Sequence, residues 1–258
     1  MKKHYSIILF FILGVLVITS TVFAYSYVAS EIGYTPTDDN WDVDNTKDAL
    51  DSLYENINSY ICMFVPDTQY SGTKGEVGSL YSCNMGDDIA RLFYIMKINT
   101  SDVQMLMASN ITDTVGQVNL SWYDAMSFFE TGAGVSVKAL WDKAISVGLP
   151  TATEISEAGG MTGWSGSSWS YFGVNSTSDS SKKNNYAWLY NNLRGSTYGS
   201  NDSAHSPGYW TTTQVASNTN KAWEVYSGGW LGSDALDRSD NNGVRPVVKI
   251  PKTIIDLN

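Results

Sequence analysis

The chain has 258 residues and is acidic, because 16 Lys and Arg residues stand against 26 Asp and Glu residues, a formal net charge of −10 at pH 7. No basic cluster or stripe interrupts this balance, which argues against a nucleic-acid backbone or an anionic lipid surface as the ligand. The 9 Trp and 16 Tyr residues allow a buried core, which argues against a disordered chain.

The N-terminus has the three parts of a secretory signal. Lys2 and Lys3 give a basic start, residues 7–18 are almost wholly apolar, and small residues follow. Since no charged side chain occurs between Lys3 and Glu31, the same stretch also supplies the ~20 residues that a spanning helix needs. Residues 1–30 therefore fit either a cleaved signal peptide or a retained membrane anchor. Both place the remainder outside the membrane, secreted or at the cell surface, because lysines before the apolar run favour a cytoplasmic N-terminus.

Residues 31–58 are expected to form a spacer and one short helix. Asp44 or Asn45 can cap this helix, and apolar side chains then recur at helical spacing. They are Ala49, Leu50, Leu53, Tyr54 and Ile57. Because one short stripe is not stable alone, the helix must pack on the body or on copies of itself, by self-association through residues 45–58. The nine residues from 45 resemble short segments of phage tail fibres and bacterial surface proteins.

Apolar residues at alternate positions predict strands in the first part of the body. The expected strands are residues 61–65, 79–83, 92–98 and 103–108, the last two as a hairpin. Cys62 and Cys83 fall on the first two strands of an exported domain, so we expect them to form a disulfide, with Cα atoms ~4.4–6.8 Å apart. Closing that loop would contribute ~3 kcal/mol in the chain-entropy model.

Three helices are expected in the middle of the body. Ser121 can cap the first, whose apolar face would hold Trp122, Ala125, Met126 and Phe129. Residues 137–147 are the second candidate. Pro150 and a capping Thr151 precede the third, which ends at two glycines, residues 159–160.

The last part of the body combines a ring-rich segment with strands. Residues 160–207 are rich in Gly, Ser and Asn but carry aromatic rings at close intervals, so they must fold over something. The strand-like runs that follow are residues 209–213, 222–226 and 243–250. We expect Trp210 and Trp223 in the core, because alternation puts Trp223 and Val225 on one face and Glu224 and Tyr226 on the other.

Three segments, in this order, resemble the formylglycine-generating-enzyme-like branch of the C-type-lectin fold. They are LPTATEISEAGG at 149–160, the YW pair at 209–210 with AWEV at 222–225, and GVRPV at 243–247. The ending is similar to that of uncharacterised secreted bacterial proteins and of retroelement-diversified ligand-binding proteins. Two positions depart from the branch's pattern, Gly148 for Arg and Ile155 for Trp.

The resemblance implies an α+β fold. It predicts a C-type-lectin-like domain of twisted antiparallel strands with two or three short helices, over residues 59–252. A hydrophobic leader helix and the short stalk helix would precede this domain, and a tail, residues 253–258, would follow it.

The catalytic equipment of that branch is missing from the sequence. Its oxidases need a late cysteine pair, but no cysteine follows Cys83, and its iron enzymes need several histidines. His205 is the one histidine of the body, so a Cys/His zinc site is excluded too. A Ser-His-Asp site would have to use His205 without a nucleophile elbow, and a loop histidine is the better account. We expect no enzyme and no cofactor.

Calcium deserves separate consideration because sugar-binding members of the fold use it. This sequence lacks their Glu-Pro-Asn or Gln-Pro-Asp and Trp-Asn-Asp motifs. Asp234, Asp237 and Asp240 share one expected loop, but Arg238 lies among them and their spacing lacks the alternation of an EF-hand. A solvated loop is the expectation, and the sequence leaves calcium binding there open.

Residues 226–242 have the composition of a binding loop, with rings for contact area and Ser, Gly and Asn for adaptable hydrogen bonds. The candidate ligand-binding residues are Tyr226, Trp230, Asp234, Asp237, Arg238 and Asn241. We expect the ring-rich segment from Trp164 to Tyr198 to contribute to the same binding surface. The favoured function is a non-catalytic, exported module that binds a glycan or a protein. An enzyme of unrecognised chemistry on the same scaffold and a structural fibre or surface-layer subunit are the alternatives.

Overall fold

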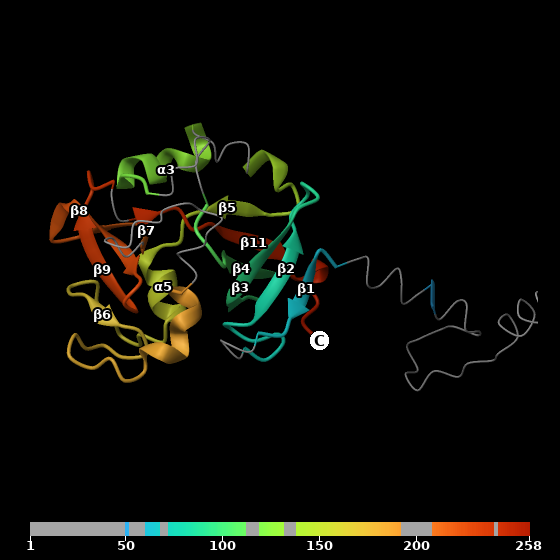
Figure 1. The fold of residues 1–258 in the computed structure, drawn as a ribbon, viewed down its shortest axis with the longest axis horizontal. Coiled ribbons are helices and arrows are strands. Elements are labelled where there is room, and N and C mark those ends of the chain that lie inside the picture. Colours follow the sequence, from blue (N-terminus) through green and yellow to red (C-terminus); the bar gives the residue numbers. More distant parts are fainter. Residues whose placement is uncertain are drawn as a thin grey trace, which may run out of the picture. The chain divides into compact units, whose positions relative to one another are not determined.

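Two mainly antiparallel sheets make up most of the body in the computed structural model (Figure 1). The structure describes residues 50–51, 60–67, 72–111, 119–131, 138–191, 208–239 and 242–258. The chain divides between Ser59 and Tyr60 into two units. In the first unit only Leu50 and Asp51 are described, and they are helical. The leader and the rest of the helix expected at 45–58 lie outside the described residues. No helix within the described ranges is long and apolar enough to cross a bilayer.

The first sheet has six strands in the order β1-β2-β3-β4-β11-β5. Their bounds are β1 Cys62–Val65, β2 Leu80–Asn84, β3 Ala90–Ile98, β4 Asp102–Met107, β5 Ser146–Gly148 and β11 Val247–Pro251. β3 and β4 form the expected hairpin. The chain therefore begins and ends the body in one sheet, because β11 pairs with β4 from the middle of the sequence.

The second sheet has five strands in the order β10-β7-β8-β9-β6. Their bounds are β6 Ser170–Tyr171, β7 Gly208–Val215, β8 Asn218–Tyr226, β9 Trp230–Ala235 and β10 Asn242–Gly243. All neighbours in it are antiparallel except β10 and β7. With few helices beside the two sheets, the α+β class expected from the sequence is confirmed.

Besides the helical residues 138–140, two α-helices and two short 3-10 helices complete the described body. They are α3 Trp122–Thr131, α5 Ala152–Ala158, η1 Lys183–Leu189 and η2 Lys252–Ile254. α5 contacts β3 of the first sheet and β7 and β9 of the second, and it lies between them in Figure 1. As predicted, Thr151 caps it: the Thr151 hydroxyl accepts from the N–H of Glu154, whose carboxylate accepts from the N–H of Thr151.

The prediction of a helix over residues 137–147 is wrong. Residues 138–140 are helical, but Ser146–Gly148 is strand β5 at the edge of the first sheet. Val147 pairs with Val248 of β11 and its side chain is buried in the core. A β-branched residue such as Val147 fits well on the pleated surface of a sheet. Packing against β11 therefore decides the structure here, although the apolar residues of 137–147 recur at helical spacing.

The helix capped by Ser121 forms at the expected position, but the face that it buries differs from the expected one. The Ser121 hydroxyl accepts from the N–H of Asp124, and α3 starts at Trp122. Phe128 is buried, whereas Met126 is 37% exposed. The buried face is therefore turned slightly from the expected one.

The disulfide between Cys62 and Cys83 is confirmed, with a Cα–Cα distance of 4.0 Å. This distance is shorter than expected because the two residues lie directly opposite each other on β1 and β2. Asn84 donates to the carbonyl of Ile61, so the next pair along the ladder, Cys62 and Cys83, is a non-hydrogen-bonded pair. Such pairs are the closer ones in antiparallel sheets.

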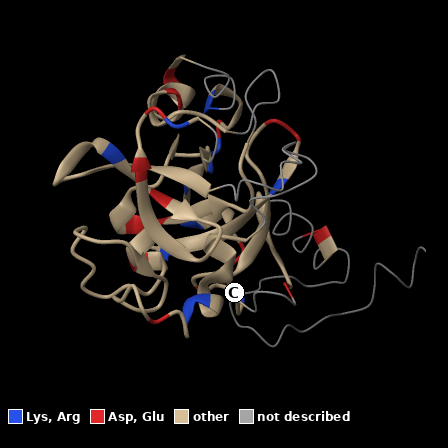
Figure 2. Cartoon of the chain, turned by 60° about the vertical axis from the view of Figure 1, so that its left-hand side comes forward, with Lys and Arg blue, Asp and Glu red and all other residues tan. Residues whose placement is uncertain are grey.

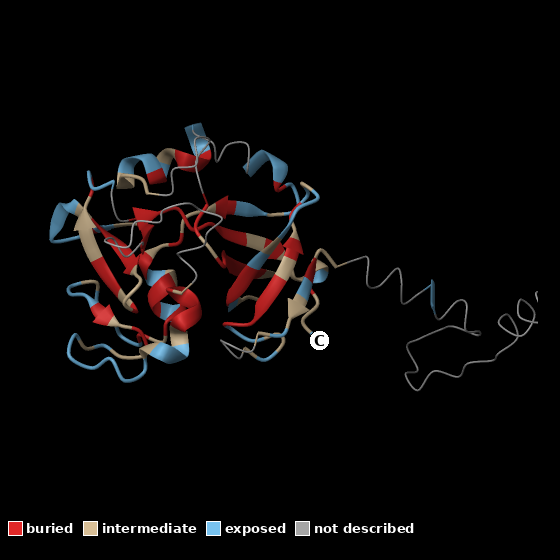
Figure 3. Ribbon diagram, in the orientation of Figure 1, coloured by how far each residue is buried: buried red, intermediate tan, exposed pale blue. Residues whose placement is uncertain are grey.

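The core consists of two apolar clusters. Figure 3 shows buried residues on strands of both sheets and on α5. Trp210 belongs to one cluster and Trp223 to the other, so both rings are in the core as predicted. Glu224 is also buried, although alternation placed it on the outer face. Glu224 is buried because β8 is an inner strand of its sheet and both faces of the strand are covered in this region.

Arg245 links the segments around the second cluster. Its guanidinium is fully buried and donates to four backbone carbonyls at 2.5 to 3.1 Å. The acceptors are Met107, Ala108, Trp188 and Leu189. One side chain thus ties the end of β4 to the end of η1.

Candidate ligand pocket

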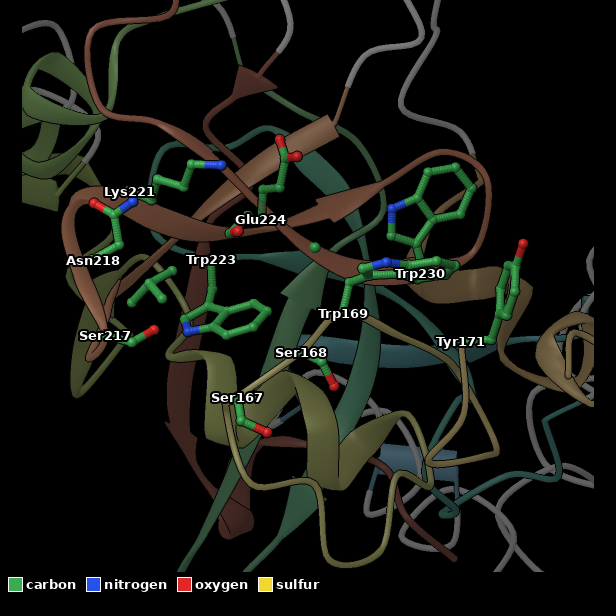
Figure 4. Close-up of a pocket in the computed structure, with 13 residues that line it drawn as sticks. Ser167, Ser168, Trp169, Tyr171, Ser217, Asn218, Lys221, Trp223, Glu224 and Trp230 are labelled. Carbon is green, nitrogen blue, oxygen red and sulfur yellow. The ribbon is translucent and has the colours of Figure 1, made fainter. Parts of the chain in front are cut away.

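A pocket with a volume of about 700 Å³ lies beside β8 and β9, opposite the loop that precedes β6 (Figure 4). It is lined by Ser167, Ser168, Trp169, Tyr171, Val215, Ser217, Asn218, Lys221, Trp223, Glu224, Trp230, Gly232 and Ser233. β6 pairs only with Trp230 and Leu231 of β9. The pocket therefore occupies the place where β6 has ended and β9 continues.

Three contacting rings form one end of the pocket. The ring centroids of Trp169 and Tyr171 are 5.4 Å apart, those of Tyr171 and Trp230 are 5.8 Å apart, and those of Trp169 and Trp230 are 6.0 Å apart. Trp169 is nevertheless 41% exposed. Because the rings touch one another, no cation can enter between them as in an aromatic cage. They instead offer an apolar wall to a ligand.

A fourth ring of the pocket, the indole of Trp223, supports the loop on the other side. The ring of Trp223 meets that of Trp164 edge to face, with centroids 4.7 Å apart. The indole N–H of Trp164 donates to the carbonyl of Ser168 at 3.0 Å. Trp223 is thus a core residue whose ring supports Trp164, and Trp164 in turn binds the backbone of Ser168. Figure 4 shows the Trp223 ring turned toward Ser167 and Ser168.

Glu224 is the buried charged group of the pocket. Only 6% of the residue is exposed, and the amide of Asn242 donates to its carboxylate. Burial raises the pKa of Glu224 to about 7, against the opposing effect of the Asn242 hydrogen bond. A carboxyl group with this pKa carries its proton part of the time near neutral pH, so it can both accept and donate.

The Trp230 indole packs closely against Gly232. A Cβ atom at position 232 would lie 3.1 Å from the indole nitrogen, closer than side chains normally approach, and 3.8 Å from Oε1 of Glu224. A glycine at this position therefore lets the Trp230 ring lie against the backbone of β9, next to the Glu224 carboxyl group.

Polar side chains line the end of the pocket opposite Tyr171. Ser217, Asn218 and Lys221 come from the β7–β8 turn and the start of β8 (Figure 4). Lys221 has no ion-pair partner within the described part of the chain. Figure 2 shows Lys and Arg residues interspersed with Asp and Glu on the body, in keeping with the scattered charges of the sequence.

The expectation of loops throughout residues 226–242 is wrong, because a strand lies within this segment. Residues 230–235 form β9, joined to β8 by a tight turn in which Gly229 has φ +89°. That conformation suits glycine, and it allows Tyr226 and Trp230 to pair and stack with ring centroids 4.5 Å apart. Both rings are half-buried, whereas we expected them to be exposed.

The structure describes five of the six candidate ligand-binding residues, and these five do not form one site. Trp230 lines the pocket, and Tyr226 stacks behind it. Asp234 forms an ion pair with Arg238, 3.0 Å between Oδ2 and Nη1, and Asp237 is exposed nearby. Asn241 lies outside the described residues, as do Asp240 and His205. Across the described ranges, no three Asp, Glu, His or Cys side chains are grouped closely enough to hold a metal ion.

Several lining residues escaped the sequence analysis. Lys221 and Glu224 lie on either side of the Ala222–Trp223 pair. The signal that could have revealed Glu224 is a carboxylate between apolar residues of an inner strand. Ser167 and Ser168 fall within the ring-rich segment, but serines of a loop carry no individual signal.

Comparison with known proteins adds no relative. No protein-family model matches the chain, and neither do any curated proteins or solved structures. The functional assignment rests on the pocket itself.

Proposed function

We propose that this chain is an exported, non-catalytic binding module of C-type-lectin-like fold, and that its ligand, a glycan or a protein, occupies the pocket beside β9. The observation that carries the proposal is the exposed ring of Trp169, held against Trp230 at the mouth of a pocket with polar groups at its other end. A rigid ring offers contact area at low entropic cost, and hydroxyl and amide groups orient what binds there.

The proposed location supports this function. A basic start followed by an apolar run delivers the body to the outside, either as a secreted protein or on a retained anchor. Ligands there are surface glycans and proteins. The helix expected at 45–58 would hold the module near the membrane or join copies of it.

One observation favours an enzyme as the second candidate. Buried carboxyl groups with a raised pKa serve as general acids in many active sites, and Glu224 has this property within the pocket. The two functions differ in what Glu224→Gln would do. An enzyme would lose turnover by about 100-fold or more, whereas a binding module would keep most of its affinity.

Arrays provide the direct test. The full-length chain, purified in detergent, should be applied to a glycan array and to a peptide array, and each ligand found should be titrated. We expect binding without conversion of the ligand, and Glu224→Gln should change its affinity by less than about tenfold, the effect of one hydrogen bond. Ligand turnover that depends on Glu224 would contradict the proposal.

A further inference from the structure

The polar end of the pocket is built around a single turn. β7 ends at Val215 and β8 begins at Asn218. The turn between them and the start of β8 bring Ser217, Asn218 and Lys221 to the end of the pocket opposite Tyr171 (Figure 4). Ser217 and Asn218 are exposed and Lys221 is half-buried, so a ligand in the pocket can reach all three side chains.

These three side chains offer hydrogen-bond donors to the pocket. The amide oxygen of Asn218 already accepts from the N–H of Asn220 at 3.2 Å, so the amide NH2 group is the end that is left for a ligand. The ammonium group of Lys221 can only donate, and within the described ranges it forms no ion pair. The hydroxyl group of Ser217 can also donate. This end of the pocket therefore favours a ligand group that only accepts hydrogen bonds, such as a carboxylate or a sulfate group.

The charges of the pocket favour the same groups. Of the described residues that line it, Lys221 alone is cationic and Glu224 alone is acidic. Glu224 is buried and its carboxylate accepts from Asn242, so the ammonium group is the charge that a ligand meets. Because the chain as a whole is acidic, this local positive charge selects where an anionic group binds and does not attract anions to the whole surface.

The exposed ring and the ammonium group belong to different levels of β9. The register of β6 and β9 places Trp169 beside Gly232. Lys221 pairs with Ala235, three residues further along β9. Three residues of a strand span about 10 Å. A ligand that contacts both groups must therefore extend along the pocket, as an oligosaccharide does.

A sugar with an acidic group suits both ends of the pocket. The C–H groups of a pyranose ring form an apolar face, which can lie on the exposed ring of Trp169. The acidic group can then reach the donors around Lys221. An Asp or Glu side chain of a peptide offers the acidic group without a rigid apolar face beside it. The pocket therefore favours an acidic glycan over an acidic peptide.

We infer that the pocket binds a glycan that carries a carboxylate or sulfate group, with a sugar ring on Trp169 and the acidic group on Ser217, Asn218 and Lys221. This inference rests on the proposed function and narrows its ligand to acidic glycans.

Matched glycans on an array test the inference with the full-length chain. The array should hold oligosaccharides with uronic acids beside the same oligosaccharides reduced to neutral hexoses, and sulfated beside unsulfated forms. We expect the acidic member of a pair to bind about tenfold or more tightly, as expected for a hydrogen bond to a charged group, and the preference to shrink as salt is added. A preference for the uronic acids identifies the group as a carboxylate, and a preference for the sulfated forms identifies it as a sulfate.

Variants of the protein locate the acidic group. Lys221→Gln keeps a long polar side chain but removes the charge, so it should weaken binding of the acidic glycan about tenfold and leave its neutral counterpart unchanged. Lys182→Gln, at an exposed lysine that does not line the pocket, is the control and should change neither affinity. Wild-type affinity of Lys221→Gln for the acidic glycan would overturn the inference. If Lys221→Gln fails to fold, the comparison of acidic and neutral glycans decides alone.

The same arrays separate the inference from the proposed function. If neutral and acidic glycans bind equally well, in a manner that needs Trp169, the binding function holds and the preference for acidic glycans is wrong. Binding of peptides without binding of glycans would have the same consequence. If neither array yields a ligand, both proposals fail.

Discussion

At the scale of single residues, two charged groups are buried among the described residues of the body, and their roles differ. Arg245 is satisfied by backbone carbonyls and is structural, whereas Glu224 has one described side-chain donor, Asn242, and faces the pocket. The sequence could not reveal either burial. Both residues stand in strand-like runs whose alternation gives no sign that a second layer covers them.

Glu224 should make stability depend on pH. Its pKa in the folded protein is about 7, above the usual 4.5, so the folded state keeps a proton that the unfolded state has lost. Stability is therefore highest below pH ~4.5 for this group and falls as the pH rises through about 7, at ~1.4 kcal/mol per pH unit between the two values and ~3 kcal/mol in total.

Urea unfolding of wild type and Glu224→Gln across this window measures the effect. Gln mimics the protonated carboxyl group and can still accept from Asn242, so the variant should lack this loss of stability at higher pH. Equal pH profiles for the two proteins would contradict the assignment.

Arg245→Met should destabilise the body by ~3–5 kcal/mol. Methionine fills part of the volume but leaves four buried carbonyls without their donor. The midpoint of denaturant unfolding measures this cost. Arg238→Met, at an exposed arginine, is the matched control and should change stability little. A small effect at Arg245 would show that water replaces the guanidinium.

At the scale of elements, local chemistry was a good guide where a cap or a cysteine fixes the chain. The cap at Thr151 and the disulfide were both predicted, because each depends on a few residues close in sequence or on a covalent bond. The errors occur where packing decides. Residues 146–148 became a sheet edge, and residues 230–235 became a strand because β8 and β6 pair with them.

Loss of the α5 cap should cost ~1 kcal/mol. Thr151→Ala removes the hydroxyl that accepts from Glu154, and thermal or urea unfolding should report the loss. Thr153→Ala, on the exposed face of the same helix, is the control with the same chemical change. If both variants lose the same stability, the capping bond contributes nothing specific.

Removal of the disulfide should lower the free energy of unfolding by ~3 kcal/mol. Replacing both Cys62 and Cys83 by Ala tests this without leaving a reactive thiol. Because the two residues already face each other on paired strands, the strands themselves should remain. Unchanged stability in the double variant would mean that the bond adds nothing to the pairing.

At the scale of the whole molecule, the body places a pocket at the point where a short strand ends beside a longer one. Composition indicated binding by rings and small polar residues, and Trp230 was among the candidates. The site itself could not be derived, because it joins Trp169 in one loop to Lys221 and Glu224 on a distant strand. The pairing of β6 with β9 and the contact of Trp164 with Trp223 bring these segments together.

The most direct test of the account is the affinity of Trp169→Ala for a ligand found on the arrays, measured by titration against wild type and Tyr123→Ala. Both substitutions remove an exposed ring, but only Trp169 lines the pocket. A ring that anchors a ligand contributes ~2 kcal/mol, so Trp169→Ala should weaken binding by about tenfold or more without lowering the melting temperature, while Tyr123→Ala binds as wild type does. Equal affinities in all three proteins would show that the ligand binds elsewhere.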